Sequence, residues 1–192
     1  MNEKHQFIPY TTTESSSEDL IKNSEKYYQE IDKRRSVRAF SNKDIPREVI
    51  ENIIKTAGSA PSGAHKQPWT FCVISDAKLK SKIRKLAEKE EFENYHGRMS
   101  DSWKADLQHF GTDHIKEFLE VAPYLIVVFK KVFDLDKDDN KSQNYYVNES
   151  VGIACGFLIA AIHQAGLVTL THTPSPMKFL QKALGRPKNE KA

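Results

Sequence analysis

The sequence predicts an α/β (α+β) protein in which helices surround one central sheet. Apolar residues recur at helical spacing in several segments, and short apolar runs bounded by turn residues lie between those segments. The two kinds of segment follow one another in the order α-α-β-α-α-β-α-β-α, which is typical of a sheet covered by helices. A length of 192 residues suits one such domain with a small appendage.

The first third of the chain is expected to form an arm and two helices. Residues 1–15 are polar and rich in serine and threonine, so we expect a flexible arm before a domain over 16–192. Ser17 can cap the first helix, which has two acidic residues in its first turn. Pro46 and Gly58 bracket the second helix. Its apolar stripe consists of Val49, Ile50, Ile53, Ile54 and Ala57.

The middle of the chain contains two expected strands. An apolar, β-prone run predicts a strand over residues 70–75, and Asp76 can cap a helix directly after it. Residues 94–111 are only weakly patterned. A short helix over 114–121 is expected before a buried strand over 124–129.

The longest expected helix covers residues 145–165. It is apolar nearly all round from Val151 onward and carries several small residues. Such a helix must be buried centrally or lie in a subunit interface. A third strand over residues 167–173 and a last helix over 177–184 complete the expected elements.

Composition and charge exclude several classes of protein. The net charge of +3 comes from 29 basic and 26 acidic residues that are interleaved, so no basic stripe for nucleic acid is indicated. The seven histidines lack metal-ligand spacing, which argues against a metal site. Cys72 and Cys155 lie in apolar runs, which is typical of core thiols in a reducing compartment.

The longest uncharged apolar stretch, residues 151–162, is shorter than the roughly 20 residues that span a bilayer. The N-terminus is polar and acidic and does not resemble a signal peptide. We therefore expect a soluble, cytoplasmic protein with no membrane anchor in this chain.

The loop over residues 60–69, APSGAHKQPW, is the strongest local indication of a binding site. Two prolines and a glycine make it an ordered connection between a helix and a strand. Ser62, Gly63 and Ala64 are small and leave backbone N–H groups open to a ligand. Long ordered loops in compact domains are usually functional, so we interpret this one as half of a cofactor site.

Two further segments could bind a phosphorylated cofactor. Arg34, Arg35 and Arg38 offer guanidinium groups that match phosphate oxygens, and Ser36 adds a hydroxyl donor. The alternative is a basic helix end that complements the helix dipole. Alternating threonines at the end of the third strand would point to one side, and the alternative there is β-propensity on an exposed edge.

Glu91, Tyr95 and Lys116 form a third candidate group. Glu91 and Tyr95 are four residues apart, so they share one face of a continuous helix. The alternative is an ordinary solvated surface.

Together these segments resemble the iodotyrosine deiodinase branch of the nitroreductase-type flavoproteins. The resemblance covers roughly residues 32–192 and rests on RRSVRAFS from Arg34, TAGSAPSGAHKQPWTF from Thr56, ENYHGRM from Glu93, HIKEFLEVAPYLIVVFK from His114, ESVGIACGFLIAAIHQAGLVTLTHTP from Glu149 and LGRP from Leu184. RRSVR is shared by many nitroreductases. The loop APSGAH-x-x-PWTF with the Glu-x-x-x-Tyr and Ile-Lys-Glu motifs is more specific to the deiodinase branch.

The resemblance implies a nitroreductase-like fold with a central mixed sheet, in a domain-swapped homodimer that binds FMN between its subunits. One motif of the family binds the phosphate, the ribityl chain and the polar edge of the flavin. The residues that match this motif are Arg34, Arg35, Ser36, Val37 and Arg38. Ser62 and Gly63 match the loop that contacts FMN from the partner chain. Thr171, His172 and Thr173 match the segment beside the flavin, where the Thr173 hydroxyl donates to N5.

The resemblance also implies a substrate site. The Ala64 N–H matches the donor to the phenolate of the substrate, so Ala64 and Thr173 are the expected catalytic residues. Glu91, Tyr95 and Lys116 match the group that clamps the ammonium and carboxylate of the amino acid. The implied activity is FMN-dependent reductive dehalogenation of mono- and diiodotyrosine to tyrosine and halide. Its electrons would come ultimately from NADPH through a separate reductase.

Two alternatives stay open from the sequence. One is a general nitroreductase that uses NAD(P)H directly, for which the zwitterion clamp has no use. The other is a catalytically impaired, truncated homologue that binds halotyrosine. The family continues past LGRP with another strand, a phosphate-binding arginine and an extension around the partner, whereas this sequence ends five residues after Pro187. We therefore expect the domain over 16–192 to lack that strand and extension.

Overall fold

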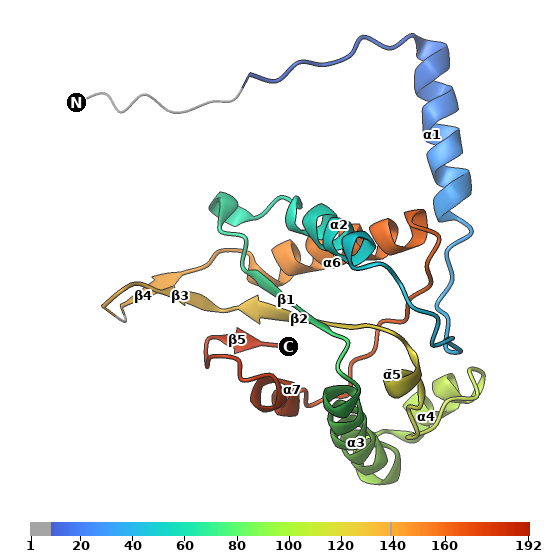
Figure 1. Cartoon of the computed structure of the whole chain (residues 1–192), viewed down its shortest axis with the longest axis vertical. Coiled ribbons are helices and arrows are strands. Elements are labelled where there is room, and N and C mark those ends of the chain that lie inside the picture. Colours follow the sequence, from blue (N-terminus) through green and yellow to red (C-terminus); the bar gives the residue numbers. More distant parts are fainter. Residues whose placement is uncertain (1–8, 139) are drawn as a thin grey trace. The chain divides into compact units, whose positions relative to one another are not determined.

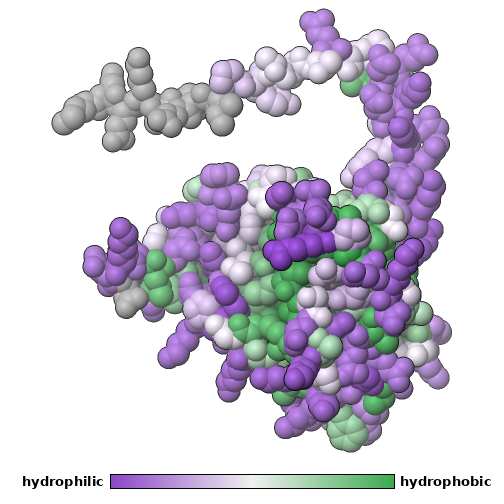
Figure 2. Space-filling model, viewed as in Figure 1, coloured by the Kyte–Doolittle hydropathy of each residue, from purple (hydrophilic) through white to green (hydrophobic). Residues whose placement is uncertain are grey.

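The computed structural model describes residues 9–138 and 140–192, and the chain divides into two compact units at Arg34 and Arg35 (Figure 1). Of the arm expected over residues 1–15, residues 1–8 lie outside the described residues, and residues 9–15 form no helix or strand. The helix of the first unit is α1 (Ser17–Ile31). The structure describes all of its residues, and none of them is buried. Figure 2 shows a largely hydrophilic surface along it.

The residue that caps α1 is Ser16 and not the expected Ser17. Ser16 has an extended backbone, and its hydroxyl oxygen accepts a hydrogen bond from the Asp19 amide at 3.1 Å. Ser17 already has helical geometry as the first residue of the helix. A serine caps the helix as predicted, but it lies one residue earlier than expected, because two serines in succession offer the same side chain.

The elements of the second unit begin and end close to most of the expected positions. In chain order they are α2 (Arg47–Gly58), η1 (Gly63–His65), β1 (Trp69–Ile74), α3 (Ala77–Glu93), η2 (Asn94–Arg98), α4 (Asp101–Gln108), α5 (Phe118–Val121), β2 (Leu125–Lys131), β3 (Phe133–Leu135), β4 (Lys141–Gln143), α6 (Val147–Gln164), α7 (Lys178–Ala183) and β5 (Glu190–Lys191).

The main sheet of the described residues has the strand order β1-β2-β5, and each neighbouring pair is antiparallel. The register of its long pair runs from Trp69 opposite Lys130 to Ile74 opposite Leu125. The two-residue strand β5 at the C-terminal end was not predicted, since two residues show no periodicity. A separate hairpin consists of β3 and β4.

Helices cover both faces of this sheet (Figure 1). On one face, Phe71, Ile126 and Val128 pack against a core formed by α2 and α6, whose buried residues are Ile53, Ala57, Leu158 and Ile162. On the other face, buried Ile74 and Phe129 pack with Ile83 of α3 and Leu180 of α7. Side chains alternate between the two faces because successive residues of a strand point in opposite directions.

The strand expected over residues 167–173 does not form. Its pairing is limited to one parallel bridge between Thr169 and Ser36. The run has the composition of a strand, but a strand needs a neighbour along its whole length, and none of the described segments lies beside it over more than this bridge. The strand pairs β1-β2, β2-β5 and β3-β4 are all antiparallel. Among the described residues, this bridge is therefore the one parallel pairing that corresponds to the expected mixed sheet.

The weakly patterned region after α3 is helical in two parts, the π-helix η2 and α4. Ser100 caps α4 by accepting from the Trp103 amide at 3.2 Å. The helix expected over 114–121 is reduced to α5. Side chains take the amides before it, since Ile115 N–H donates to Asp113 and Lys116 N–H donates to Glu88, each at 2.8 Å.

Across the described residues, no helix combines the length and the apolar character that crossing a membrane would require. Both cysteines are unbridged. Burial raises the pKa of the Cys72 and Cys155 thiols, and both residues are half-buried and not in the fully buried core.

Candidate functional site

Two segments that the sequence assigned to the cofactor lie side by side in the second unit. Ser36 and Thr169 form the parallel bridge, and the Val37 amide donates to the Thr169 carbonyl at 3.3 Å. The chain therefore runs from Arg35 to Arg38 next to the segment that leads to Thr171. These segments are more than 130 positions apart in the sequence, and only tertiary pairing brings them together.

The side chains around this bridge suit a polar, anionic ligand. Thr171 and Thr173 are exposed at the end of their segment, as are Arg35 and Arg38 on the other. The Arg38 guanidinium lies 4.7 Å from the centre of the Phe110 ring. Arg34 belongs to the first unit, where its amide donates to the Ile31 carbonyl at 3.0 Å directly after α1.

The loop over residues 60–69 has a strained and well-bonded backbone. Ala64, His65 and Gln67 all have positive φ angles of 46 to 53°, a region that few non-glycine residues adopt. The Ser62 hydroxyl accepts from the Gln67 amide at 2.9 Å and closes the turn. Strain of this kind is typical of functional loops, because the surrounding structure must hold it in place. Ala64 is exposed at the top of this turn.

Gly63 anchors the loop to the start of α6. Its amide donates to the Ser150 hydroxyl at 3.3 Å, and Ser150 is buried. A Cβ atom built at Gly63 would come within 2.8 Å of the Tyr145 carbonyl oxygen. The glycine therefore permits a close approach of two backbones. Its amide, which was expected to be open to a ligand, is instead bonded to Ser150.

The three residues of the expected zwitterion clamp are brought together. Glu91 at the end of α3 is buried, and its Oε2 lies 3.9 Å from Nζ of the buried Lys116. Lys116 Nζ donates to the Thr112 hydroxyl at 3.1 Å and to the Asp113 carbonyl. The Tyr95 ring centre lies 5.7 Å from the same ammonium. The interpretation of this group as an ordinary solvated surface is therefore wrong.

Burial changes the protonation behaviour of this group. It lowers the pKa of the Lys116 ammonium, and the nearby charges of Glu91 and Asp113 oppose that shift. Burial also raises the pKa of the Tyr95 hydroxyl, which donates to the Thr112 carbonyl at 3.1 Å. Tyr95 thus stays neutral over the physiological range and can act as a hydrogen-bond donor.

His172 joins the clamp to the predicted flavin segment. Its Nε2 lies 3.1 Å from Oε1 of Glu91, and its ring meets Phe118 edge-on with centres 5.5 Å apart. A second link is the Asn94 amide group, which donates to the Ser175 carbonyl at 2.9 Å. The sequence carried no signal for either contact, since no local spacing relates α3 to residues 172–175.

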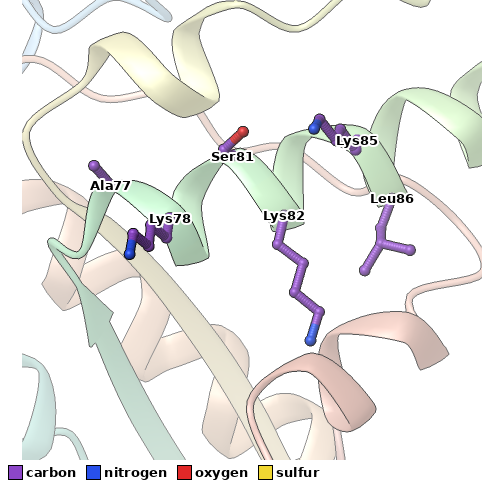
Figure 3. Close-up of a pocket in the computed structure, with 6 residues that line it drawn as sticks. All are labelled: Ala77, Lys78, Ser81, Lys82, Lys85 and Leu86. Atoms are coloured by element: carbon purple, nitrogen blue, oxygen red, sulfur yellow. The ribbon is translucent and has the colours of Figure 1, made fainter.

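A surface groove elsewhere on the second unit lies apart from these residues. Figure 3 shows that its lining residues all come from α3, namely Ala77, Lys78, Ser81, Lys82, Lys85 and Leu86. None of the candidate site residues lines it. It is therefore separate from the arrangement described above.

Comparison with known proteins identifies the family. The model of the nitroreductase family matches residues 31–192. A protein of Haliscomenobacter hydrossis named iodotyrosine deiodinase is 64% identical over 191 residues, which cover 100% of this chain and 86% of that relative. The chain belongs to the iodotyrosine deiodinase family. The human iodotyrosine deiodinase 1 is 47% identical over 190 residues, covering 98% of this chain and 66% of the human protein.

Solved structures agree with membership of the iodotyrosine deiodinase family. A crystal structure of oxidized iodotyrosine deiodinase bound to FMN and 3-iodo-L-tyrosine superposes with a TM-score of 0.77 at 31% identity. The match covers 86% of this chain and 84% of that one. A Bacteroides fragilis nitroreductase with bound FMN, at 21% identity and a TM-score of 0.62, shares the fold. The chain thus has the nitroreductase-like α+β fold.

Proposed function

We propose that this chain is an FMN-dependent oxidoreductase that removes iodine reductively from mono- and diiodotyrosine. The reaction replaces a carbon–iodine bond by a carbon–hydrogen bond, takes up two electrons and one proton, and releases iodide and tyrosine. The observation that carries this proposal is the buried pair of Glu91 and Lys116, with the half-buried Tyr95 next to it, beside His172 in a member of the deiodinase family. A general nitroreductase has no need of a buried zwitterion site.

The residues near the Ser36–Thr169 bridge fit FMN by their chemistry. Arg35 and Arg38 provide cations for a phosphate and for the polar edge of a flavin, and Ser36 adds a hydroxyl. Thr173 is exposed next to this segment, so its hydroxyl can donate to the N5 position of a flavin. FMN supplies the electrons when it is bound. A separate NADPH-dependent reductase would in turn reduce it.

The clamp binds the amino-acid end of the substrate. Glu91 accepts hydrogen bonds from the substrate ammonium, and Lys116 donates to its carboxylate. Tyr95 adds a neutral hydroxyl and a ring face. The Ala64 amide holds the phenolate oxygen at the other end of the ring. Burial of the clamp excludes water and strengthens each of these electrostatic contacts.

A complete site requires two copies of the chain. The Gly63 loop is bonded to the start of α6, whereas the Ser36–Thr169 bridge follows its end. These places are separated by the length of an 18-residue helix, roughly 27 Å at 1.5 Å per residue. One FMN therefore receives Arg35 and Arg38 from one subunit and Ser62 and Gly63 from the other.

The free face of α6 supports this homodimer. Ile153 and Phe157 are 43% and 40% exposed, and Gly152 and Gly156 lie next to them. An apolar helix face with small residues allows close packing of a second helix, so it suits an interface better than contact with water.

Anaerobic turnover tests the proposed function. Purified protein saturated with FMN is reduced with dithionite, which replaces the natural donor, and is then mixed with 3-iodotyrosine. Iodide release and tyrosine formation in equal amounts are expected. A nitroaromatic compound serves as the comparison substrate. Reduction of that compound without iodide release from iodotyrosine would replace the proposal by a general nitroreductase.

A further inference from the structure

The hydrogen bonding of Glu91 assigns a particular role to His172. The two carboxylate oxygens of Glu91 face different partners, since Oε1 lies 3.1 Å from His172 Nε2 and Oε2 lies 3.9 Å from Lys116 Nζ. The second distance is too long for a hydrogen bond. Among residues 9–138 and 140–192, the side chain that lies within hydrogen-bond distance of the Glu91 carboxylate is therefore that of His172.

The direction of this hydrogen bond follows from the chemistry of the two groups. A carboxylate only accepts hydrogen bonds, so the hydrogen between them belongs to Nε2 of His172. The imidazole ring is held in place from another element, because it packs edge-on against Phe118. His172 is itself mostly buried, with 17% of its side chain exposed. The pair is therefore fixed on both sides.

We propose that His172 is a positioning residue for Glu91 and makes recognition of the substrate ammonium depend on pH. This proposal rests on the proposed function, in which Glu91 binds the ammonium of halotyrosine. The neutral ring donates from Nε2 to Oε1, fixes the plane of the carboxylate and leaves Oε2 directed at the clamp. The ammonium then meets a carboxylate that keeps its full negative charge.

Protonation of His172 changes this balance. His172 contacts Glu91 of α3 and the ring of Phe118. Glu91 in turn faces Lys116, which interacts with Asp113, Glu88 and Arg38. An added positive charge 3.1 Å from Glu91 neutralises the charge that attracts the ammonium, and it repels the ammonium directly. Affinity for the zwitterion therefore falls when the pH is low enough to protonate His172.

Two variants separate the hydrogen bond from the charge. His172→Gln keeps an N–H donor but cannot be protonated, and His172→Ala removes the donor.

The dissociation constant of 3-iodotyrosine is measured by the change in flavin fluorescence of the FMN-loaded protein between pH 5.5 and 8. The second ligand is 3-(3-iodo-4-hydroxyphenyl)propionate, which keeps the phenol and carboxylate but lacks the ammonium. His109→Gln, an exposed histidine after α4, is the matched control.

The expected pattern is specific to the ammonium. At pH 7.5, His172→Ala weakens iodotyrosine binding by about tenfold to a hundredfold, as for loss of one buried hydrogen bond to a charged group. It leaves the propionate within about twofold, and His172→Gln restores most of the loss. Between pH 7.5 and 5.5 the wild-type protein loses iodotyrosine affinity that His172→Gln retains.

Two results would overturn the role of His172. One is equal weakening of both ligands by His172→Ala, which would indicate a general structural effect. The other is an unchanged loss of affinity at low pH in His172→Gln. Failure of the proposed function would give a different result. The wild-type protein loaded with FMN would then bind no iodotyrosine at any pH. In that case the role of His172 would be excluded as well.

Discussion

The amide of Gly63 and the hydroxyl of Ser150 are 87 positions apart in the sequence and 3.3 Å apart in the structure. This contact fixes the strained loop at the start of α6. The segment that contains Thr169 follows the opposite end of the same helix and pairs with Ser36. Helix α6 therefore separates the two parts of the expected flavin site within one chain. We propose that a second chain packs on the exposed apolar face of α6 and completes the site.

Replacing Gly63 by alanine should destabilise the protein and weaken FMN binding. The new Cβ atom would lie 2.8 Å from the Tyr145 carbonyl oxygen, and a backbone atom cannot move aside as the end of a side chain can. We expect a loss of about 1–3 kcal/mol in the free energy of unfolding, measured by urea denaturation. Gly58→Ala is the control, since no atom lies within 4 Å of its added Cβ. Equal stability of the two variants would contradict the close approach.

A charge on the free face of α6 should separate the subunits. Phe157→Asp places a carboxylate in the expected interface, where it would be buried without a partner. We expect a monomer by light scattering, together with loss of FMN from the gel-filtered protein. The control is Val121→Asp on α5, a residue that is 39% exposed against 40% for Phe157. A Phe157→Asp variant that remains dimeric and holds FMN would exclude α6 from the interface.

Lys116→Gln should abolish most of the affinity for halotyrosine while FMN stays bound. The substitution removes the buried cation that faces Glu91 and leaves that carboxylate without a nearby positive side chain. A cost of about 1.5–3 kcal/mol corresponds to a ten- to hundredfold rise in the dissociation constant. Titration of the FMN-loaded protein with iodotyrosine measures it, and Lys85→Gln in the groove of α3 is the control. Unchanged affinity would show that the clamp is not the ammonium and carboxylate site.

Glu190 should make the stability of the protein sensitive to acid. Burial alone would raise the pKa of its carboxyl, but hydrogen bonds from Arg186 and from the Thr70 hydroxyl hold that pKa below its ordinary value of 4.5. The unfolded chain therefore binds a proton at Glu190 at a higher pH than the folded chain does. The stability that Glu190 contributes is complete above pH 4.5 and is lost as the pH falls through the lower, folded pKa.

The measurement is urea unfolding of wild type and Glu190→Gln from pH 7 to pH 3.5. At pH 7 the variant should be about 1–3 kcal/mol less stable, and this difference should shrink below pH 4.5. Glu51→Gln is the control, because Glu51 forms a similar pair with Arg47 on the surface. A difference between wild type and Glu190→Gln that stays constant over this range would rule out a lowered pKa.

Local patterns predicted most of the helices and both long strands correctly. The apolar stripe that includes Ile50, Ile53 and Ala57 is the buried face of α2, and Asp76 caps α3 as expected. Such features depend on residues three or four positions apart, so they can be read from the chain. The two wrong predictions concern the cap at Ser16 and the strand over residues 167–173. Neighbouring serines can both act as a cap, so the sequence does not decide between them. A strand also needs a partner strand, and composition does not indicate where that partner lies.

By itself, the sequence determined the fold class, the family and the residue types of the candidate site. These follow from periodicity and from motifs of consecutive residues, whose physical effects are local. Only the tertiary structure decided that Glu91 meets His172, that Gly63 rests on Ser150 and that Ser36 pairs with Thr169. Each of these contacts joins segments more than 80 positions apart. They depend on how the whole core packs around the sheet, which no local spacing records.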